Sequence, residues 1–379
     1  MYNTSYHQAI FSNYILNTTI IFMNSNEIVI VINPGSTSTK IALYNRTELI
    51  NELIVRHSQV DLDQFQKVTD QFEYRYQMVE DGLDEMLSKE DLHVVGIVGR
   101  GGIVKPLEGG TYRINNSFLE DAKTGKYGDH ASNLGSMLAN KLAKHFNLDE
   151  SFTVDPVSAG NIWEKARISG VPGIERNRRG HPLNMKMTAR KTAKQQNITF
   201  EEAKYVIAHL GGGISIASVD GGKIVDVNDA LMGMGPFSPN RAGALPSRGV
   251  MDLCYSMPRN EVEALLSKNS GLKAYLGVDD LRDVFKLIDS GNEKAQLIYD
   301  AFVYQIAKEI GAYHVALKCK ANGIIITGGI AYSERFISDL KTYVEKLTNF
   351  FVYPGENEME ALAEGAFRVI DGKEMALEY

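Results

Sequence analysis

The chain has 379 residues, of which 44% are apolar and 23% charged, a composition typical of a globular protein with about two domains. Its formal net charge is -7, so the composition gives no reason to expect binding to nucleic acid or to an anionic membrane. An anionic ligand would therefore need a local group of hydrogen-bond donors.

The first 26 residues are predicted to be an extension outside the fold, either disordered or not native to the protein. Their apolar stretch from Ile15 to Met23 is short and interrupted by polar residues, so we do not expect it to span a bilayer. The two cysteines, Cys254 and Cys319, are isolated and indicate neither a disulfide framework nor a zinc site. Two free thiols suit a reducing compartment, and we expect a cytoplasmic protein.

A strand, a tight loop and a second strand are predicted at the start of the fold. Glu27 to Ile32 is a nearly continuous β-branched run, residues 33–35 (Asn-Pro-Gly) end it, and a second run extends from Ile41 to Tyr44. Small hydroxyl residues and Lys40 lie between the two runs. The spacing of a Walker A loop is absent, and no helix is expected directly after Lys40.

The same pattern recurs in the second half of the chain. Tyr205 to Leu210 is predicted as a strand, the three glycines at 211–213 as a turn, and Ile214 to Val219 as the returning strand. Later in each half a buried type of strand ends in glycines, at 94–102 and at 323–329. Helices are expected at about 70–89, 129–146 and 333–347. The repetition predicts two related α/β domains.

Each glycine- and hydroxyl-rich loop is a candidate phosphate site, because bare backbone N–H groups and hydroxyls let an anion approach closely. A single loop of this kind is more often only a turn, but two in duplicated contexts favour a nucleotide. A third glycine pair, Gly328-Gly329, lies between a strand and a helix, where a base and ribose could lie against bare backbone. A close contact between that helix and strand explains the pair equally well.

Two arginines occupy loop positions fixed by glycine or proline. Arg100 lies in GRGG at a strand end, and Arg241 lies in PFSPNRAGALP. A guanidinium can bind carboxylate or phosphate through two parallel hydrogen bonds, so the pair suits a carboxylate acceptor and a phosphoryl group in transfer. For each arginine alone, a surface salt bridge is an equal alternative.

Histidines and carboxylates also lie at turns. His181 and His209 are placed to donate to phosphoryl oxygens, although a lone histidine is more often structural; His130, at a helix start, is the weakest candidate. Asp155 follows a strand and Glu358 begins a helix, and magnesium in nucleotide sites takes one or two carboxylates. An Asx turn and a favourable helix dipole are the alternatives for these two acids.

Together these segments resemble the acetate/butyrate kinase family. INPGSTSTK, GRGG, HLGGGIS, MGPFSPNRAGALP, ITGGIAYSE and GENEMEALAEGA follow in this order from about Glu27 onward. The resemblance implies a duplicated actin-like, ribonuclease H-like fold, with ATP and Mg²⁺ bound in the cleft between the domains, and at least a dimer. It implies an acyl-substrate domain at 27–170, joined by a C-terminal helix at about 360–379, and a nucleotide-binding domain at 171–359.

The same resemblance implies roles for single residues. Arg100 would bind the acyl carboxylate, His181 would hold the reacting phosphoryl group, and Arg241 would stabilise the transition state. Asp155 would be the catalytic carboxylate near magnesium, and Glu358 a second carboxylate linked to the metal. The residues implied in binding phosphate and adenosine are Asn33, Ser36, Ser38, Lys40, His209, Gly211, Gly212, Gly213, Asp280, Arg282, Gly328, Gly329, Ile330 and Ala331.

Three glycines predict an acyl pocket wider than acetate needs. Gly101 and Gly102 stand where the acetate enzymes carry apolar bulk, and Gly180 where they carry a phenylalanine. The predicted reaction is a reversible, in-line transfer of the ATP γ-phosphoryl group to butyrate, giving butyryl phosphate and ADP. Acetate, propionate and branched acids are the alternative substrates. A non-enzymatic nucleotide-binding protein of the same superfold is the alternative from another class.

Overall fold

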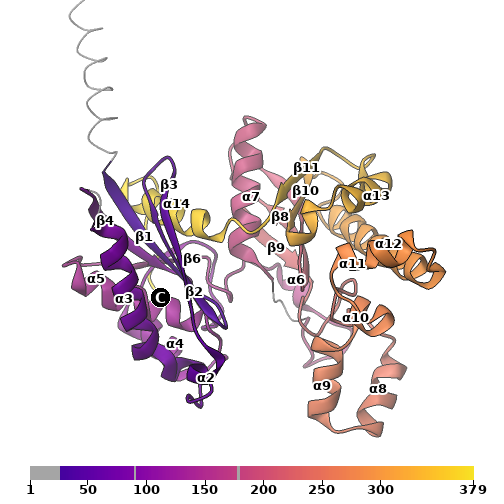
Figure 1. Ribbon diagram of the computed structural model, residues 1–379. Helices are drawn as coiled ribbons and strands as arrows, with labels where there is room; N and C mark the ends of the chain where they lie inside the picture. The colour runs from indigo at the N-terminus through magenta and orange to yellow at the C-terminus, as the bar shows by residue number, and fades with distance from the viewer. Residues whose placement is uncertain (1–25, 89–90, 177–179) are drawn as a thin grey trace, which may run out of the picture. The chain divides into compact units, whose positions relative to one another are not determined.

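The computed structural model describes residues 26–88, 91–176 and 180–379 (Figure 1). Apart from Asn26, the predicted extension at 1–26 lies outside the described residues. The chain divides into two compact units. The described part of the first unit comprises residues 26–88, 91–106, 110–158 and 359–379, and that of the second comprises 107–109, 159–176 and 180–358. Residues 159–170, which the sequence assigned to the first domain, thus lie in the second unit.

The first unit contains a six-stranded mixed sheet with the order β3-β2-β1-β4-β6-β5. Its strands are β1 (Glu27–Pro34), β2 (Ser38–Tyr44), β3 (Leu49–Arg56), β4 (His93–Gly99), β5 (Thr111–Arg113) and β6 (Phe152–Val154). Its helices are α2 (Gln59–Leu62), the 3-10 helix η1 (Val68–Gln71), α3 (Phe72–Leu87), α4 (Asn116–Thr124), α5 (Asn133–His145) and α14 (Glu358–Ile370).

Strand β1 lies inside this sheet because its β-branched run is apolar on both faces and is fully buried from Ile28 to Ile32. It pairs antiparallel with β2 and parallel with β4. One face of the sheet packs on α5 so closely that a Cβ on Gly99 would lie only 2.0 Å from the Gly135 carbonyl oxygen. The other face packs on α14, where Ile370 lies against Gly96. The sheet is therefore covered by helices on both faces.

The second unit contains a five-stranded sheet with the order β11-β10-β7-β8-β9. Its strands are β7 (Lys204–Leu210), β8 (Ile214–Asp220), β9 (Lys223–Val227), β10 (Gly323–Gly328) and β11 (Phe350–Pro354). Its helices are α6 (Glu164–Arg167), α7 (Pro182–Gln195), α8 (Ser247–Ser256), α9 (Arg259–Lys268), α10 (Gly271–Leu276), α11 (Leu281–Asp289), α12 (Glu293–Ala316), the 3-10 helix η2 (Gly329–Tyr332) and α13 (Glu334–Val344).

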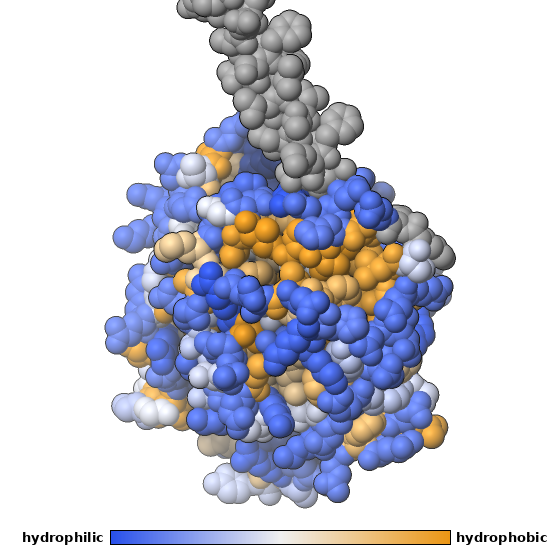
Figure 2. Space-filling view, turned by 90° about the vertical axis from the view of Figure 1, so that its left-hand side faces the viewer, coloured by the Kyte–Doolittle hydropathy of each residue, from blue (hydrophilic) through white to orange (hydrophobic). Residues whose placement is uncertain are grey.

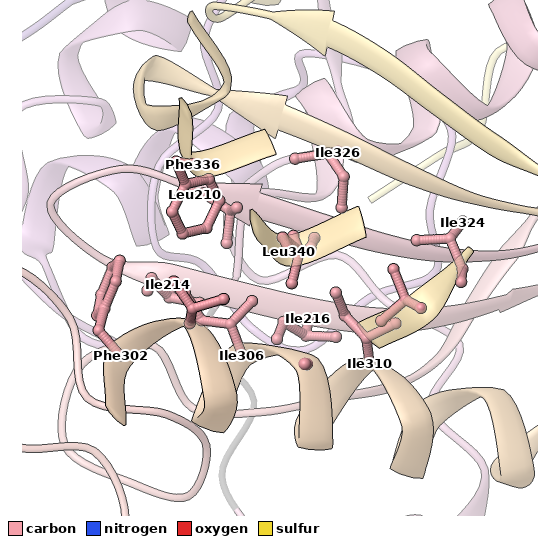
Figure 3. Packing of buried hydrophobic residues seen from close by; sticks show 14 of the residues in the cluster. Leu210, Ile214, Ile216, Phe302, Ile306, Ile310, Ile324, Ile326, Phe336 and Leu340 are labelled. Carbon is pink, nitrogen blue, oxygen red and sulfur yellow. The ribbon is translucent and has the colours of Figure 1, made fainter. Parts of the chain in front are cut away.

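The core of the second unit lies between this sheet and helix α12 (Figure 3). Phe302, Ile306 and Ile310 recur every four residues along α12, so they form one apolar stripe that faces the strands. Isoleucines of β8 and β10 and two residues of α13 fill the space between them. On the opposite face, Met185 and Ala189 of α7 pack against alternate residues of β7. Because both faces are buried, the strands read as continuous apolar runs.

The two sheets repeat one arrangement. In chain order β1, β2, β3, β4 and β6 correspond to β7, β8, β9, β10 and β11, with an antiparallel meander followed by two parallel strands. This confirms the predicted duplicated α/β fold. The connections are also exchanged: α7 follows β6 along the chain but packs on the second sheet, and α14 follows β11 but packs on the first.

The surface drawn in Figure 2 is mainly hydrophilic, with apolar side chains gathered in one area near its top. Within the described part of the chain, no helix combines the length and the apolar character needed to cross a membrane. The first sheet has an open edge at β3, where Leu49 and Ile54 are partly exposed. Glu52 and Arg56 of the same strand are also exposed, and charges on an edge strand oppose pairing with another chain.

Candidate active site

Three candidate residues lie at the carboxyl ends of neighbouring strands in the first unit. Asn33 is near the end of β1, Arg100 directly follows β4, and Asp155 directly follows β6. β1 pairs in parallel with β4, and β4 with β6, so these ends meet at one edge of the sheet. Open α/β sheets bind their ligands at this edge. The structure therefore brings together candidates that are far apart in the sequence.

Asp155 has an unusual backbone. Its φ is +40°, in the left-handed region that side chains other than glycine rarely adopt, and the residue is only 4% exposed. Its backbone N–H donates to the Gly110 carbonyl oxygen at 2.9 Å. Such a conformation costs on the order of 1–3 kcal/mol and persists only where neighbouring structure imposes it. The position of this carboxylate is thus fixed by its surroundings.

The first candidate phosphate loop is the connection between β1 and β2. The Gly35 N–H donates to the Ser38 carbonyl oxygen at 2.7 Å, which closes a tight turn. Ser36 and Lys40 are exposed, and Lys40 pairs with Asn33 across the hairpin. All four implied residues, Asn33, Ser36, Ser38 and Lys40, therefore lie within one hairpin of the first unit.

The three glycines that predict a wide acyl pocket each have other segments of their own unit beside them. A Cβ on Gly102 would lie 1.9 Å from Asn133 Oδ1, and one on Gly101 would lie 2.6 Å from Thr153 Oγ1. A Cβ on Gly180 would meet Val227 at 3.2 Å and Ser215 Oγ at 3.5 Å. The missing side chains allow close packing inside each unit, and the wider acyl pocket stays a prediction.

The sequence could not reveal this packing. Asn133 begins α5 and reaches the GRGG segment from 30 residues away to accept the Ile103 N–H at 2.9 Å. Glycine is required where another segment approaches the backbone this closely. The expected acyl specificity therefore needs a test of its own.

In the second unit two histidines stack beside the second glycine loop. The rings of His181 and His209 are nearly parallel, with centroids 3.9 Å apart. His181 Nδ1 lies 3.0 Å from Ser215 Oγ, and Asn184 Nδ2 donates to His209 Nδ1 at 2.8 Å. These contacts fix both rings, and they place His181, at the start of α7, next to the end of β7.

Arg241 lies directly against the same loop. Its Nη1 donates to the Ala230 carbonyl oxygen at 2.6 Å, and a Cβ on Gly213 would fall 2.2 Å from that nitrogen. Ser238 joins the two segments, since its hydroxyl donates to the Gly212 carbonyl oxygen and accepts the Arg241 N–H. Burial lowers the pKa of Arg241, but a guanidinium stays charged in any protein environment. A fixed positive charge therefore borders the glycine turn.

A cavity of about 660 Å³ opens beside this loop, within the range of small-ligand sites. Six of the predicted nucleotide residues line it: Gly211, Gly212, Asp280, Arg282, Gly329 and Ile330. Asp280 caps α11 by accepting the Arg282 N–H at 2.8 Å and also binds the Arg282 side chain. Gly328 and Ala331 flank the lining residues along the chain.

Two aromatic residues of this cavity were not predicted from the sequence. Phe285 lies on α11 and Tyr332 at the end of η2, and both line the cavity. Aromatic faces are suitable surfaces for a flat base. Phe285 directly follows the motif VDDLRDV, and Tyr332 lies within ITGGIAYSE, so these two motifs were the signal available.

Two carboxylates are ligands of the type that a magnesium ion prefers. Asp155 is 4% and Glu358 is 9% exposed, and hard carboxylate oxygens are preferred ligands of Mg²⁺. Among the described residues no group of three or more His, Cys, Asp and Glu side chains is arranged to hold a metal. Magnesium in a nucleotide site takes phosphate oxygens and water as its other ligands, so a denser protein cluster is not required.

Known proteins resemble the chain over nearly its whole length. A Clostridium botulinum protein named "Probable butyrate kinase" is 41% identical over 356 residues, which cover 93% of this chain and 99% of the relative. A Listeria monocytogenes protein with the same name is 43% identical over 353 residues, again 93% of this chain and 99% of the relative.

Solved structures share the fold. The acetate kinase of Porphyromonas gingivalis superposes with a TM-score of 0.72 at 16% identity, covering 90% of this chain and 99% of that one. A propionate kinase from Francisella tularensis gives a TM-score of 0.69 at 20% identity, covering 89% and 98%. The sequence profile of the acetokinase family matches residues 174–371. The chain therefore belongs to the acetokinase family and is a phosphotransferase with a carboxyl group as acceptor.

Proposed function

We propose that the chain transfers the γ-phosphoryl group of ATP to the carboxylate of butyrate, giving butyryl phosphate and ADP in a reversible, in-line reaction. One arrangement in the second unit carries the proposal. Arg241 lies against Gly213, His181 stacks on His209 beside the same loop, and the nucleotide-sized cavity begins at Gly211. A glycine turn, a half-buried guanidinium and fixed imidazoles are the groups that a phosphoryl group in transfer needs.

The donors on Arg241 support a role in the transition state. Nη1 is already bound to the Ala230 carbonyl oxygen, which holds the guanidinium in one orientation. Nε is buried and makes no hydrogen bond with the described residues. A buried N–H without a protein partner is costly, and such groups occur where a ligand supplies the acceptor. We assign this edge of the guanidinium to the phosphoryl oxygens.

The acceptor needs orientation more than activation. A carboxylate is already a nucleophile, so no strong general base is required, and Arg100 would align it through two parallel hydrogen bonds. Asp155 and Glu358 would hold Mg²⁺, directly or through water, and the bound ion would neutralise charge on the β- and γ-phosphates. His181 would hold the moving phosphoryl group. Binding of ATP between the two units and assembly into a dimer or larger oligomer stay predictions.

Butyrate is proposed as the acid because the two relatives at 41% and 43% identity carry the name "Probable butyrate kinase". Acetate, propionate and branched acids are the competing substrates. Two additional methylene groups buried in a fitting pocket are worth about 1.6 kcal/mol, or roughly 15-fold in kcat/KM. A pocket that suits butyrate should therefore favour it over acetate by at least an order of magnitude.

The test is acyl-phosphate formation from Mg-ATP, trapped as the hydroxamate, with acetate, propionate, butyrate, isobutyrate and valerate. We expect the highest kcat/KM with butyrate. A value for acetate equal to or above that for butyrate would refute the acyl specificity, and no hydroxamate with any acid would refute the reaction.

The role of Arg241 is tested by Arg241→Ala, which should lower kcat by about 10³-fold and change nucleotide affinity little. Arg259→Ala, which removes an exposed arginine that pairs with Glu263 on α9, is the matched control and should leave kcat unchanged. A near-normal kcat in Arg241→Ala would remove this residue from the mechanism.

A further inference from the structure

The loop between β1 and β2 is held from inside the first unit by Arg75 of α3. This arginine is fully buried. Its Nη1 donates to the Gly35 carbonyl oxygen at 2.8 Å and, more weakly, to that of Ser38 at 3.4 Å. Its Nη2 donates to the Ser36 carbonyl oxygen at 2.8 Å. One guanidinium thus binds three carbonyl groups of a single turn.

In the described part of the chain, no acid balances the charge of Arg75. Its remaining bonds go to neutral groups, with Gln71 Oε1 accepting from Nε at 3.0 Å and from Nη2 at 2.8 Å. Among the described residues no carboxylate forms an ion pair with it. Burying an unpaired charge is expensive, and proteins usually pair or expose such a group. A fully buried arginine that faces only neutral acceptors therefore calls for a reason beyond packing.

The nearby histidine does not supply a second charge. His57 Nε2 lies 2.9 Å from Thr39 Oγ1, which in turn lies 3.4 Å from Arg75 Nη1. Burial, and then the charge of Arg75, lower the pKa of His57 to about 4, so this ring is neutral at physiological pH. Burial lowers the pKa of Arg75 to about 10, which leaves the guanidinium protonated. Of these two groups, only Arg75 brings a positive charge to the turn.

The bound carbonyls also orient the opposite side of the turn. In a trans peptide the C=O and the following N–H point in opposite directions. Because the Gly35 and Ser36 carbonyls point to Arg75, the N–H groups of Ser36 and Thr37 point away from it. Neither of these N–H groups makes a hydrogen bond within the described chain, and both residues are exposed. Successive free N–H groups of this kind form an anion-binding concavity.

We propose that Arg75 is a positioning residue for phosphate binding: it fixes the Gly35–Ser38 turn so that its N–H groups face the anion, and it gives the turn a buried positive charge. The inference rests on the proposed function and on the prediction from the sequence that this hairpin binds phosphate of the nucleotide. Arg75 does not touch the ligand itself. It acts through the peptide groups that it binds, whose N–H donors become more polar as their carbonyls accept from a cation.

The experiment compares the binding of Mg-ATP, tripolyphosphate and adenosine to the full chain by calorimetry. Adenosine lacks phosphate, so its binding should depend only on the cavity of the second unit. Arg75→Met keeps much of the side-chain volume but removes the charge and the donors. Losing hydrogen bonds from a charged group should weaken ATP and tripolyphosphate about 10- to 100-fold, while adenosine affinity stays within about twofold. Arg75→Lys keeps the charge but lacks the two-pronged guanidinium, so its affinities for ATP and tripolyphosphate should lie between those of the unmodified chain and Arg75→Met.

Arg46→Met is the matched control. Arg46 is a second arginine of the first unit, less buried than Arg75, and is bound to Glu27 and Asp371 at the other end of β2. Its loss should lower the melting temperature but leave the ratio of ATP to adenosine affinity unchanged. A purely structural role for Arg75 predicts the same pattern for Arg75→Met. An unchanged ratio in Arg75→Met, or in Arg75→Lys if the methionine variant fails to fold, would overturn the proposal.

The outcome is separable from that of the proposed function. If the unmodified chain forms no acyl phosphate but Arg75→Met still lowers the ratio of ATP to adenosine affinity, the carboxylate reaction is wrong and the positioning role stands. If acyl phosphate forms but Arg75→Met leaves the ratio of ATP to adenosine affinity unchanged, the carboxylate reaction stands and the positioning role is wrong.

Discussion

Replacing Gly213 by alanine should disable Arg241 while leaving that residue itself unmutated. The added Cβ would lie 2.2 Å from Arg241 Nη1 and 3.0 Å from Cζ, well inside van der Waals contact. The guanidinium must then move by roughly 1 Å or more to restore a normal contact, which breaks its bond to the Ala230 carbonyl oxygen. A displacement of about 1 Å in a catalytic group can cost about 10²-fold. We therefore expect kcat to fall about a hundredfold, equivalent to about 2.7 kcal/mol.

The backbone itself should tolerate this change, because Gly213 does not have a left-handed φ. The melting temperature should therefore stay close to that of the unmodified protein. The decisive assay is a double-mutant cycle, with kcat measured for Gly213→Ala, Arg241→Ala and the double variant. If the alanine acts through Arg241, it should cost nothing further once Arg241 is gone. Additive losses, or an unchanged kcat in Gly213→Ala, would refute the assignment.

Three further predictions concern stability. Burial lowers the folded pKa of His57 to about 4, below its unfolded value, so the free energy of unfolding should fall by about 3 kcal/mol as the pH drops from about 6.5 to 4. In His57→Leu the free energy of unfolding should depend less steeply on pH over this range. An unchanged slope would contradict this prediction. Gly102→Ala should destabilise the protein by about 1–3 kcal/mol through its clash with Asn133 and lower activity with all acids alike; a selective gain for acetate would instead favour the open-pocket interpretation. Gly311→Ala fills open space within α12 and should stabilise the protein by about 0.5–1 kcal/mol with normal activity, so a lower melting temperature would count against it.

Much of the fold could be predicted because its signals are local. The β-branched runs at Glu27 and Tyr205 and the glycines after them lie within a few residues of each other, and the strands form there. The repetition of that pattern predicted the duplication. The helix expected at 70–89 is present as η1 followed by α3, because its apolar period is also local. Candidate site residues could be found for the same reason, since they occupy strand ends and turns.

What could not be predicted depends on contacts between distant segments. Gly101 and Gly102 suggested open space, and nothing in their own segment shows that Thr153 and Asn133 lie beside them. Arg75 lies on a helix, where a lone arginine is normally expected on the surface, and nothing in its neighbourhood shows that a turn 40 residues earlier contacts it. The contact of Arg241 with Gly213 is of the same kind. Composition and periodicity describe a segment, not its neighbours in space.

The exchanged connections of α7 and α14 also determine when each half of the protein can finish folding. The first sheet is complete once β6 has been made, but α14, which covers one of its faces, begins about 200 residues later. At ~5–20 residues per second a ribosome needs on the order of 10–40 s to make that stretch. During this interval the surface around Gly96 and Val29, where Ile370 will pack, has no cover. The nascent chain should therefore be most vulnerable to aggregation, and most available to chaperones, while its second half is being synthesised.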